Sequence, residues 1–311
     1  MSIVVNNLTK KFGTQRAVDN ISFDVKEGEI VGFLGPNGAG KTTTMKIVTC
    51  YIAPSDGNVN VNGYSVLENQ DEIKKKIGYL PENNPLYHDM PVLDYLKFVA
   101  DLQAVSKDKV QSRISEMVHV CGLNVEKHKK IGELSKGFRQ RVGLAQAMIH
   151  DPEILILDEP TSGLDPNQIV EIRKLIKELG KRKTVILSTH ILPEVEATCD
   201  RILIINSGKI VADGTSEMLR KGASGQEMVR VQIGEPEKRD EVMASLREIE
   251  TIGIVDFDKE SQNSFIINSK DDRSARKDIF NLCVQKNWVL TEMTPIQTKL
   301  EDIFRELTTT N

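Results

Sequence analysis

The sequence predicts an α/β protein whose N-terminal domain, residues 1–220, is built on a phosphate-binding loop and is followed by a small α+β domain over residues 228–311. Three observations support this prediction. An apolar run, a glycine-rich loop and a helical pattern follow one another within residues 29–50. A second apolar run ends in two acidic residues at 158–159, and the composition changes at 219–227, where LRKGASGQE is typical of a linker.

Composition and charge limit the possible functions. The 311 residues carry a formal net charge of −4, so the chain lacks the basic footprint of a nucleic-acid binder, and no nucleic-acid partner is expected. No apolar run approaches the roughly 18 residues that a membrane-spanning helix needs, and the N-terminus lacks the pattern of a signal peptide. We therefore expect a cytosolic protein with reduced thiols at its four scattered cysteines, Cys50, Cys121, Cys199 and Cys283.

Residues 2–30 alternate short apolar runs with turns, which predicts strands of an antiparallel sheet. The loop that follows, GPNGAGKT, has the Walker A spacing G-x-x-x-x-G-K-[ST] and lies between the strand-like EIVGFL and the helix-like TTTMKIVTC. Its glycines let backbone N–H groups approach phosphate oxygens, and its lysine can reach the β and γ phosphates. A glycine-rich turn without a ligand is the alternative. The predicted phosphate-binding residues are Gly35, Pro36, Asn37, Gly38, Ala39, Gly40, Lys41, Thr42 and Thr43.

Helical patterns dominate residues 85–150. Near their end, LSKGFRQR places Ser135 and Gly137 at the start of a helix with an apolar face, and a helix N-terminus attracts anions. This segment would be a second phosphate-binding element in addition to the glycine-rich loop. A single nucleotide hardly needs two such elements. We therefore expect Ser135 and Gly137 to serve a nucleotide that another copy of the chain holds.

The segment ILILDE places Asp158 and Glu159 at the end of a short buried strand. The first carboxylate can hold the hydration shell of Mg²⁺ together with the Thr42 hydroxyl, and the second can orient or deprotonate an attacking water. Adjacent residues on a strand point to opposite faces, so both can serve one site only if the strand ends there. Asp158 is thus predicted as a metal ligand and Glu159 as a catalytic residue.

A third apolar run, TVILSTHIL, delivers His190 just past the end of a predicted strand. A histidine at this point could contact the γ-phosphate or the attacking water, and its position after Glu159 favours that catalytic interpretation. The alternative is a polar loop histidine whose ring bonds to backbone groups.

In this order, GPNGAGKTT, LSKGFRQR, ILILDEP, SGLD and STH resemble the nucleotide-binding subunit of ABC transporters, over about residues 1–220. The resemblance implies a P-loop ABC ATPase domain with a mixed sheet, an antiparallel β subdomain and a helical subdomain over about 85–150. It also implies ATP and Mg²⁺ as cofactors, Phe12 stacking on adenine, and a loop from Ser162 to Asp165 that faces a partner subunit. On composition alone, Phe12 could equally belong to the core of a sheet.

Two positions depart from the family pattern. The usual signature is L-S-G-G-Q, and Lys136 stands at its first glycine. Glu82, in YLPEN, occupies the position of the usual Q-loop glutamine, where the resemblance implies a catalytic role next to Mg²⁺. An ionised carboxylate cannot donate the hydrogen bond that an amide can donate. Both departures bear on the rate and the coupling of ATP hydrolysis.

Beyond residue 228, the patterns run strand, helix, two strands, helix, strand and a final helix, which predicts a small α+β domain. The ending LEDIFRELT resembles ATPases that serve ABC-2-type exporters, and the whole chain is similar to ABC-2 and gliding-motility-associated ATP-binding subunits. No cluster of titratable groups marks a catalytic site here, so packing and dimer support are favoured over ligand sensing.

The resemblance therefore implies an ATPase subunit that dimerises head-to-tail around two ATP–Mg²⁺, as a homodimer or heterodimer. It would power a separate integral-membrane permease, with export favoured over import, and lie on the cytoplasmic face of the membrane through that partner. Two other classes stay open. A soluble ABC ATPase with a macromolecular client usually has two such domains or a long coiled coil, and this sequence has one Walker A and no long heptad run. A P-loop phosphotransferase would have no use for the LSKGF segment.

Overall fold

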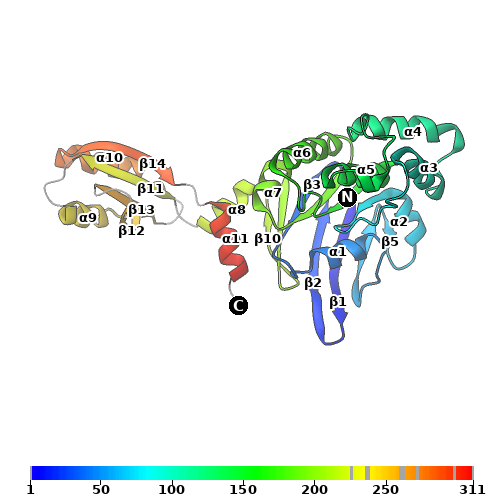
Figure 1. Ribbon diagram of the computed structural model, residues 1–311. Coiled ribbons are helices and arrows are strands. Elements are labelled where there is room, and N and C mark those ends of the chain that lie inside the picture. The colour runs from blue at the N-terminus through cyan, green and yellow to red at the C-terminus, as the bar shows by residue number, and fades with distance from the viewer. Residues whose placement is uncertain are drawn as a thin grey trace. The chain divides into compact units, whose positions relative to one another are not determined.

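The computed structural model describes residues 2–224, 227–234, 239–258, 263–270, 273–296 and 299–309. The chain divides into two compact units, residues 1–215 and 216–310 (Figure 1). The linker expected near 219–227 overlaps helix α8 (Ser216–Ser224), which belongs to the second unit. Residues 225 and 226 of that expected linker lie outside the described residues.

The first unit is centred on a six-stranded sheet with the strand order β10-β9-β3-β8-β7-β6. Strands β9 to β6 are parallel and β10 is antiparallel to β9, so the sheet is mixed, as predicted. Ile154 and Ile156 pack on one face of this sheet and Leu155 and Leu157 on the other, as the alternation of a strand requires. The strands are β3 (Ile30–Leu34), β6 (Ile77–Leu80), β7 (Ile154–Asp158), β8 (Thr184–Thr189), β9 (Arg201–Asn206) and β10 (Lys209–Gly214).

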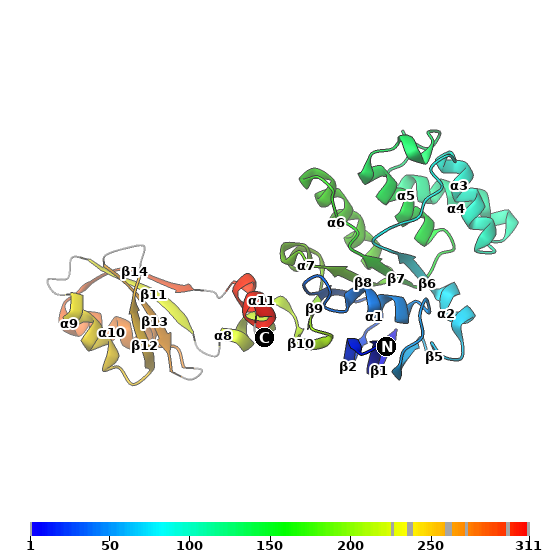
Figure 2. The same cartoon turned by 60° about the horizontal axis from the view of Figure 1, so that its bottom comes forward.

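A second, antiparallel sheet has the order β2-β1-β4-β5. Helix α1 (Lys41–Val48) lies between the two sheets (Figure 2). Its side chains Met45, Ile47 and Val48 are fully buried in one core with residues of both sheets, and burying each such side chain stabilises the fold by about 1.5–3 kcal/mol. The surrounding elements are β1 (Ile3–Phe12), β2 (Gln15–Val25), β4 (Asp56–Val61), β5 (Tyr64–Ser65) and α2 (Gln70–Lys76).

Helices cover the opposite face of the six-stranded sheet. Three of them gather near its β6 edge and form the predicted helical part (Figure 2): α3 (Val92–Leu102), α4 (Lys107–Val120) and α5 (Lys136–Met148), with a short turn η1 (Ile131–Glu133). Leu96 and Leu144 join Leu155 in one core. The remaining helices are α6 (Pro166–Gly180) and α7 (Leu192–Thr198). Asp165 caps α6, because its side chain accepts hydrogen bonds from the N–H groups of residues 167 and 168.

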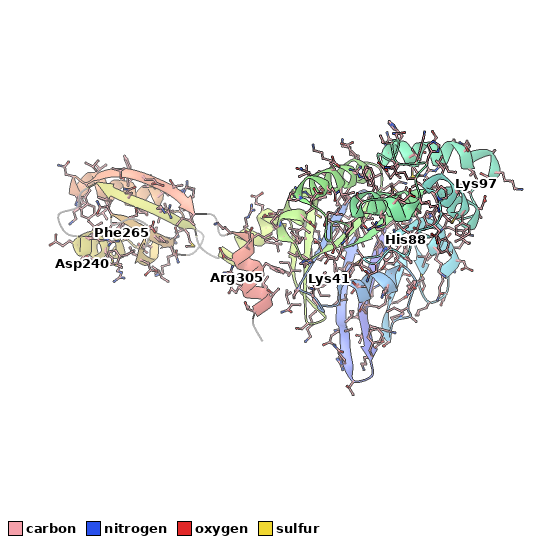
Figure 3. The ribbon with its side chains drawn as sticks, in the orientation of Figure 1. Lys41, His88, Lys97, Asp240, Phe265 and Arg305 are labelled. Atoms are coloured by element: carbon pink, nitrogen blue, oxygen red, sulfur yellow. The ribbon has the colours of Figure 1, made fainter. Side chains whose placement is uncertain are left out.

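In the second unit the elements follow one another as βαββαβ: β11 (Met228–Gly234), α9 (Arg239–Arg247), β12 (Ile252–Phe257), β13 (Ser264–Ser269), α10 (Arg276–Lys286) and β14 (Val289–Ile296). The sheet order β12-β13-β11-β14, antiparallel throughout, is that of a split βαβ motif. Phe265 lies in the core between this sheet and helices α9 and α10 (Figure 3). Helix α8 packs against α11 (Leu300–Thr309). Within the described ranges, no helix is long and apolar enough to cross a membrane.

Candidate nucleotide site

The glycine-rich loop joins β3 to α1, as the sequence pattern predicts. Gly38 and Gly40 have φ angles of +79° and +110°, which side-chain-bearing residues rarely adopt. A Cβ on Gly40 would also lie 2.5 Å from the carbonyl oxygen of Ala17. This position therefore requires glycine for two independent reasons, one of backbone conformation and one of space.

Lys41 is the first residue of α1, and its side chain is only 6% exposed (Figure 3). Its Nζ donates hydrogen bonds to the carbonyl oxygens of Gly35 at 2.7 Å and Pro36 at 3.2 Å. It also lies 3.5 Å from Oε1 of Glu159. The ammonium is thus held against the loop, where phosphate oxygens can replace one of its present partners.

Asp158 ends strand β7 and is completely buried. The hydroxyl of Ser188, its register partner on β8, donates to Oδ1, whereas Oδ2 is buried without a hydrogen-bond partner among the described residues. Burial raises the pKa of the Asp158 carboxyl, and the hydrogen bond from Ser188 and the nearby Thr42 hydroxyl oppose that rise. A buried, partnerless carboxylate oxygen beside a hydroxyl suits a hard divalent cation such as Mg²⁺.

Glu159 and His190 form the second pair at this edge of the sheet. Glu159 is 5% exposed, and its φ of +49° turns the chain out of the strand, so its side chain is not forced to the face opposite Asp158. The left-handed conformation costs roughly 1–2 kcal/mol for such a residue. Nδ1 of His190 lies 3.0 Å from both carboxylate oxygens. Because a carboxylate can only accept, Nδ1 carries the hydrogen and Nε2 is left for another partner.

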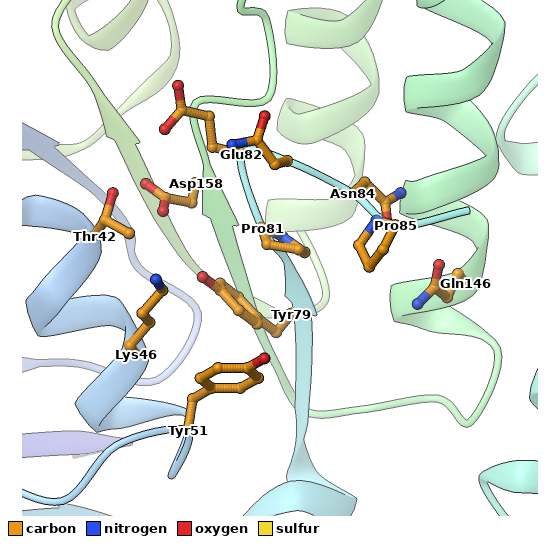
Figure 4. Close-up of a pocket in the computed structure, with 11 residues that line it drawn as sticks. Thr42, Lys46, Tyr51, Tyr79, Pro81, Glu82, Asn84, Pro85, Gln146 and Asp158 are labelled. Atoms are coloured by element: carbon orange, nitrogen blue, oxygen red, sulfur yellow. The ribbon is translucent and has the colours of Figure 1, made fainter. Parts of the chain in front are cut away.

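These groups line a cavity of about 360 Å³. Its wall consists of Ala17, Asn37, Gly38, Gly40, Lys41, Thr42, Thr43, Glu82, Glu159, Ser162 and His190. A neighbouring cavity of about 420 Å³ contains Thr42, Glu82 and Asp158, whose polar ends converge (Figure 4). The two cavities share Thr42 and Glu82, so the predicted metal-binding and catalytic side chains surround one region.

Three predicted residues lie elsewhere in the first unit. Phe12 is 52% exposed at the end of β1, with Nζ of Lys10 5.2 Å from its ring centroid, so it is not part of the sheet core. Ser135 is exposed at the N-cap of α5, where its hydroxyl accepts from the N–H of Phe138. Gly137 is buried against Gln168. None of the three lines either cavity.

Sequence reasoning did not single out Ser188, although it hydrogen-bonds to Asp158. The signal was weak, because a serine within an apolar run also fits a strand that packs in the core. Its partner became visible only when β7 and β8 were paired in register. The buried Glu194 also escaped notice, because a carboxylate in the sequence of α7 looks like any exposed helix residue.

The fold, the glycine loop with its lysine and the acidic pair define a P-loop NTPase. Residues 18–162 match the family described as ABC transporter. The chain is 33% identical over 300 residues to the uncharacterized ABC transporter ATP-binding protein YxlF of Bacillus subtilis, which covers 96% of this chain and 97% of that protein. It is 39% identical over 221 residues to the bacitracin transport ATP-binding protein BcrA of Bacillus licheniformis, covering 70% of this chain and 71% of that one.

Among solved structures, the dimeric, post-hydrolysis ATP-binding cassette MJ0796 with ADP and Pi resembles this chain with a TM-score of 0.62 at 28% identity. The likeness covers 68% of this chain and 98% of that one. The chain belongs to the ABC transporter family of ATP-binding proteins and is an ATPase. The predicted fold class and enzyme class are thereby confirmed.

Proposed function

We propose that this chain hydrolyses ATP with the help of Mg²⁺ at the site between β3, β7 and β8, and that it powers a separate membrane permease in the direction of export. The observation that carries the proposal is the carboxylate of Glu159. It lies between Lys41 Nζ and His190 Nδ1 at the wall of a cavity that also contains Thr42. This combination places an anion-binding cation, a metal-binding hydroxyl and a base around one space.

The phosphates of ATP would be held by the loop from Gly35 to Thr43 and by Lys41. Thr42 and Asp158 would hold Mg²⁺, which when bound neutralises negative charge on the β and γ phosphate oxygens. Glu82 lines both cavities and is exposed, so it can reach the same region from the end of β6. Its carboxylate would accept hydrogen bonds from metal-bound water, where an amide would also donate.

In the reaction, the oxygen of a water molecule attacks the γ-phosphorus and the bond from that phosphorus to the β–γ bridging oxygen breaks. Glu159 accepts a proton from the attacking water, which leaves inorganic phosphate and ADP as products. The Nδ1–H of His190 orients the carboxylate, and Nε2, when it also carries a hydrogen, can donate to a γ-phosphate oxygen. Glu159 is buried, so its contacts with Lys41 and His190 are less screened than those of an exposed carboxylate.

A second ATPase subunit, identical or different, would complete each site. Ser135 and Gly137 lie at the start of α5 and outside the cavities that their own chain lines. The helix N-terminus they form is suited to bind the γ-phosphate held by the partner. The dimeric state of MJ0796 supports this arrangement, as does the family resemblance of the LSKGF segment.

The proposed docking surface for the permease is an aromatic group close to the Glu82 loop. Tyr87 and Phe98 are 55% and 41% exposed, and their ring centroids lie 5.6 Å apart. Tyr87 also meets the buried Tyr95 edge-on. Exposed aromatic side chains that are held rigidly by neighbours are typical anchors of protein interfaces. Through this surface the chain would lie at the cytoplasmic face of the membrane.

Two relatives support export by an ABC-2-type or gliding-motility-associated system. BcrA is named for bacitracin transport, and the similarity to YxlF extends through nearly the whole chain, including the second unit. The resemblance of the C-terminal segment to ATPases of ABC-2-type exporters points the same way.

The test is co-purification from detergent-solubilised native membranes with tagged Glu159→Gln protein and ATP–Mg²⁺. We expect one multi-span membrane protein in stoichiometric amount, lost when Tyr87 and Phe98 are both changed to serine. Phe280→Ser, which removes an exposed aromatic side chain from the second unit, is the matched control and should retain the partner. Recovery of ribosomes, nucleic acid or the chain alone would contradict the membrane partner and favour a soluble client.

A further inference from the structure

A buried carboxylate that is not among the predicted site residues connects the segments that follow Glu159 and precede His190. Glu194 lies on α7 and is 2% exposed. Its Oε2 accepts hydrogen bonds from the hydroxyls of Thr161 at 2.8 Å and Thr189 at 3.0 Å. Both threonines are also buried, at 2% and 0% exposure. Burying a carboxylate costs free energy unless it is hydrogen-bonded. The two threonine hydrogen bonds offset part of that cost for Glu194.

Each of the two threonines lies close in sequence to one member of the Glu159–His190 pair. Thr161 follows Glu159 by two residues and begins the loop that contains Ser162, whose N–H donates to the carbonyl oxygen of Glu159 at 3.1 Å. Thr189 directly precedes His190, and its hydroxyl also accepts from the N–H of Ile191 at 3.1 Å. One oxygen of Glu194 therefore connects the loop after β7 with the last residue of β8.

Thr189 is also joined to the phosphate-binding loop. Its carbonyl oxygen accepts a hydrogen bond from the N–H of Gly35 at 3.3 Å. A shift of Thr189 would thus move His190 relative to Glu159 and disturb the start of the glycine-rich loop. A displacement of about 1 Å in a catalytic group can reduce a rate by about 10²-fold.

We propose that Glu194 is a positioning residue for ATP hydrolysis: it holds Thr161, in the loop after β7, close to Thr189, at the end of β8, so that His190 meets Glu159. The inference rests on the roles proposed above for Glu159 and His190. Glu194 touches neither nucleotide nor water in this scheme. It acts on the rate of hydrolysis through the geometry of the pair and through the Ser162 loop, which would face a second subunit.

The proposal is tested with Glu194→Ala, Glu194→Gln and Thr161→Val. A glutamine carbonyl can accept both threonine hydroxyls, so Glu194→Gln is expected to keep kcat within about 3-fold of wild type. Glu194→Ala is expected to lower kcat by about 10–10²-fold, as displaced catalytic groups do, while the Kd for a fluorescent ATP analogue stays unchanged. Thr161→Val, which is nearly isosteric, should lower kcat in the same direction. Glu196→Gln on the same helix is the matched control and should behave as wild type.

The proposal is overturned if Glu194→Ala turns over ATP like wild type, or if Glu194→Gln is as impaired as Glu194→Ala. A parallel loss of rate and ATP affinity would also contradict it, because it would indicate general damage to the fold. If Glu194→Ala does not fold, Thr161→Val decides. Comparison of the two single variants separates the two hypotheses. A normal rate in Glu159→Gln refutes the catalytic scheme, whereas an impaired Glu159→Gln with a normal Glu194→Ala refutes only this inference.

Discussion

Nδ1 of His190 lies 3.0 Å from both carboxylate oxygens of Glu159, so the ring faces the carboxylate symmetrically. The contact depends on the left-handed backbone of Glu159, which turns the residue away from the strand that ends at Asp158. It also depends on the parallel pairing of β7 and β8, which brings the two strand ends to one edge of the sheet. A strained residue persists only where its surroundings hold it, and the contacts of Glu159 with His190 and Lys41 do so here.

Glu159→Gln should lower kcat for ATP hydrolysis by about 10²–10⁴-fold, the range expected when a general base is removed. The Kd for ATP should change little, because the amide has the same shape and the Lys41 contacts with the loop remain. Steady-state phosphate release and equilibrium binding of a fluorescent analogue measure the two quantities. Turnover at the wild-type rate would refute the role of Glu159 as base.

Lys41→Ala should weaken ATP binding by about 10–100-fold, since hydrogen bonds to charged groups contribute about 1.5–3 kcal/mol each. The carbonyl oxygens of Gly35 and Pro36 would also lose their donor. Titration of ATP against protein at fixed salt gives the Kd. Lys26→Ala, which removes an exposed lysine that lines neither cavity, is the control. Unchanged affinity in Lys41→Ala would contradict the phosphate cradle.

Stability should decrease in weak acid because of His150, which follows α5. Burial lowers the pKa of its imidazole, and Nδ1 is buried without a hydrogen-bond partner among the described residues. The unfolded chain therefore binds a proton near pH 6.5 that the folded chain does not. The free energy of unfolding is highest above pH 6.5 and falls as pH drops toward the lower folded pKa, by at most about 1.4 kcal/mol per pH unit for one proton.

Urea unfolding followed by circular dichroism between pH 7.5 and 5.5 tests this effect. His150→Gln should show a smaller loss of stability over that range, whereas His119→Gln, which changes an exposed histidine, should lose stability like wild type. Equal slopes in wild type and His150→Gln would show that His150 does not control the acid response.

The cation at the signature position has a structural consequence. Gly163, in the loop after β7, has a φ of +68°, and a Cβ placed on it would overlap the ammonium of Lys136. Gly163→Ala should therefore displace the exposed, flexible end of the Lys136 side chain and cost little more than the roughly 1–2 kcal/mol of left-handed strain. Gly28→Ala is the matched control, because Gly28 has a φ of +74° and a Cβ there meets no atom within 4 Å.

Thermal unfolding and ATP turnover of the two variants measure the difference. We expect the two variants to lose similar stability, because the end of the lysine side chain can move aside. A clearly larger loss of stability in Gly163→Ala than in Gly28→Ala would contradict this expectation and show that Lys136 is held in place beside Gly163.

The sequence by itself determined the elements whose signals are local. The strand, glycine loop and helix around Lys41 could be predicted because loop conformation and phosphate binding depend on residue types at fixed spacing. The acidic pair at 158–159 was readable for the same reason, since a short apolar run ending in carboxylates marks a strand end. The helical part near 85–150 followed from its periodicity.

Tertiary structure decided which strand ends meet and which polar groups are buried. The pairing of Asp158 with Ser188 and of Glu159 with His190 requires β7 and β8 to be parallel neighbours, and residues about 30 positions apart share no local pattern. The exposure of Phe12 and the burial of Glu194 were equally invisible in the sequence, because burial depends on what packs against a residue from elsewhere in the chain.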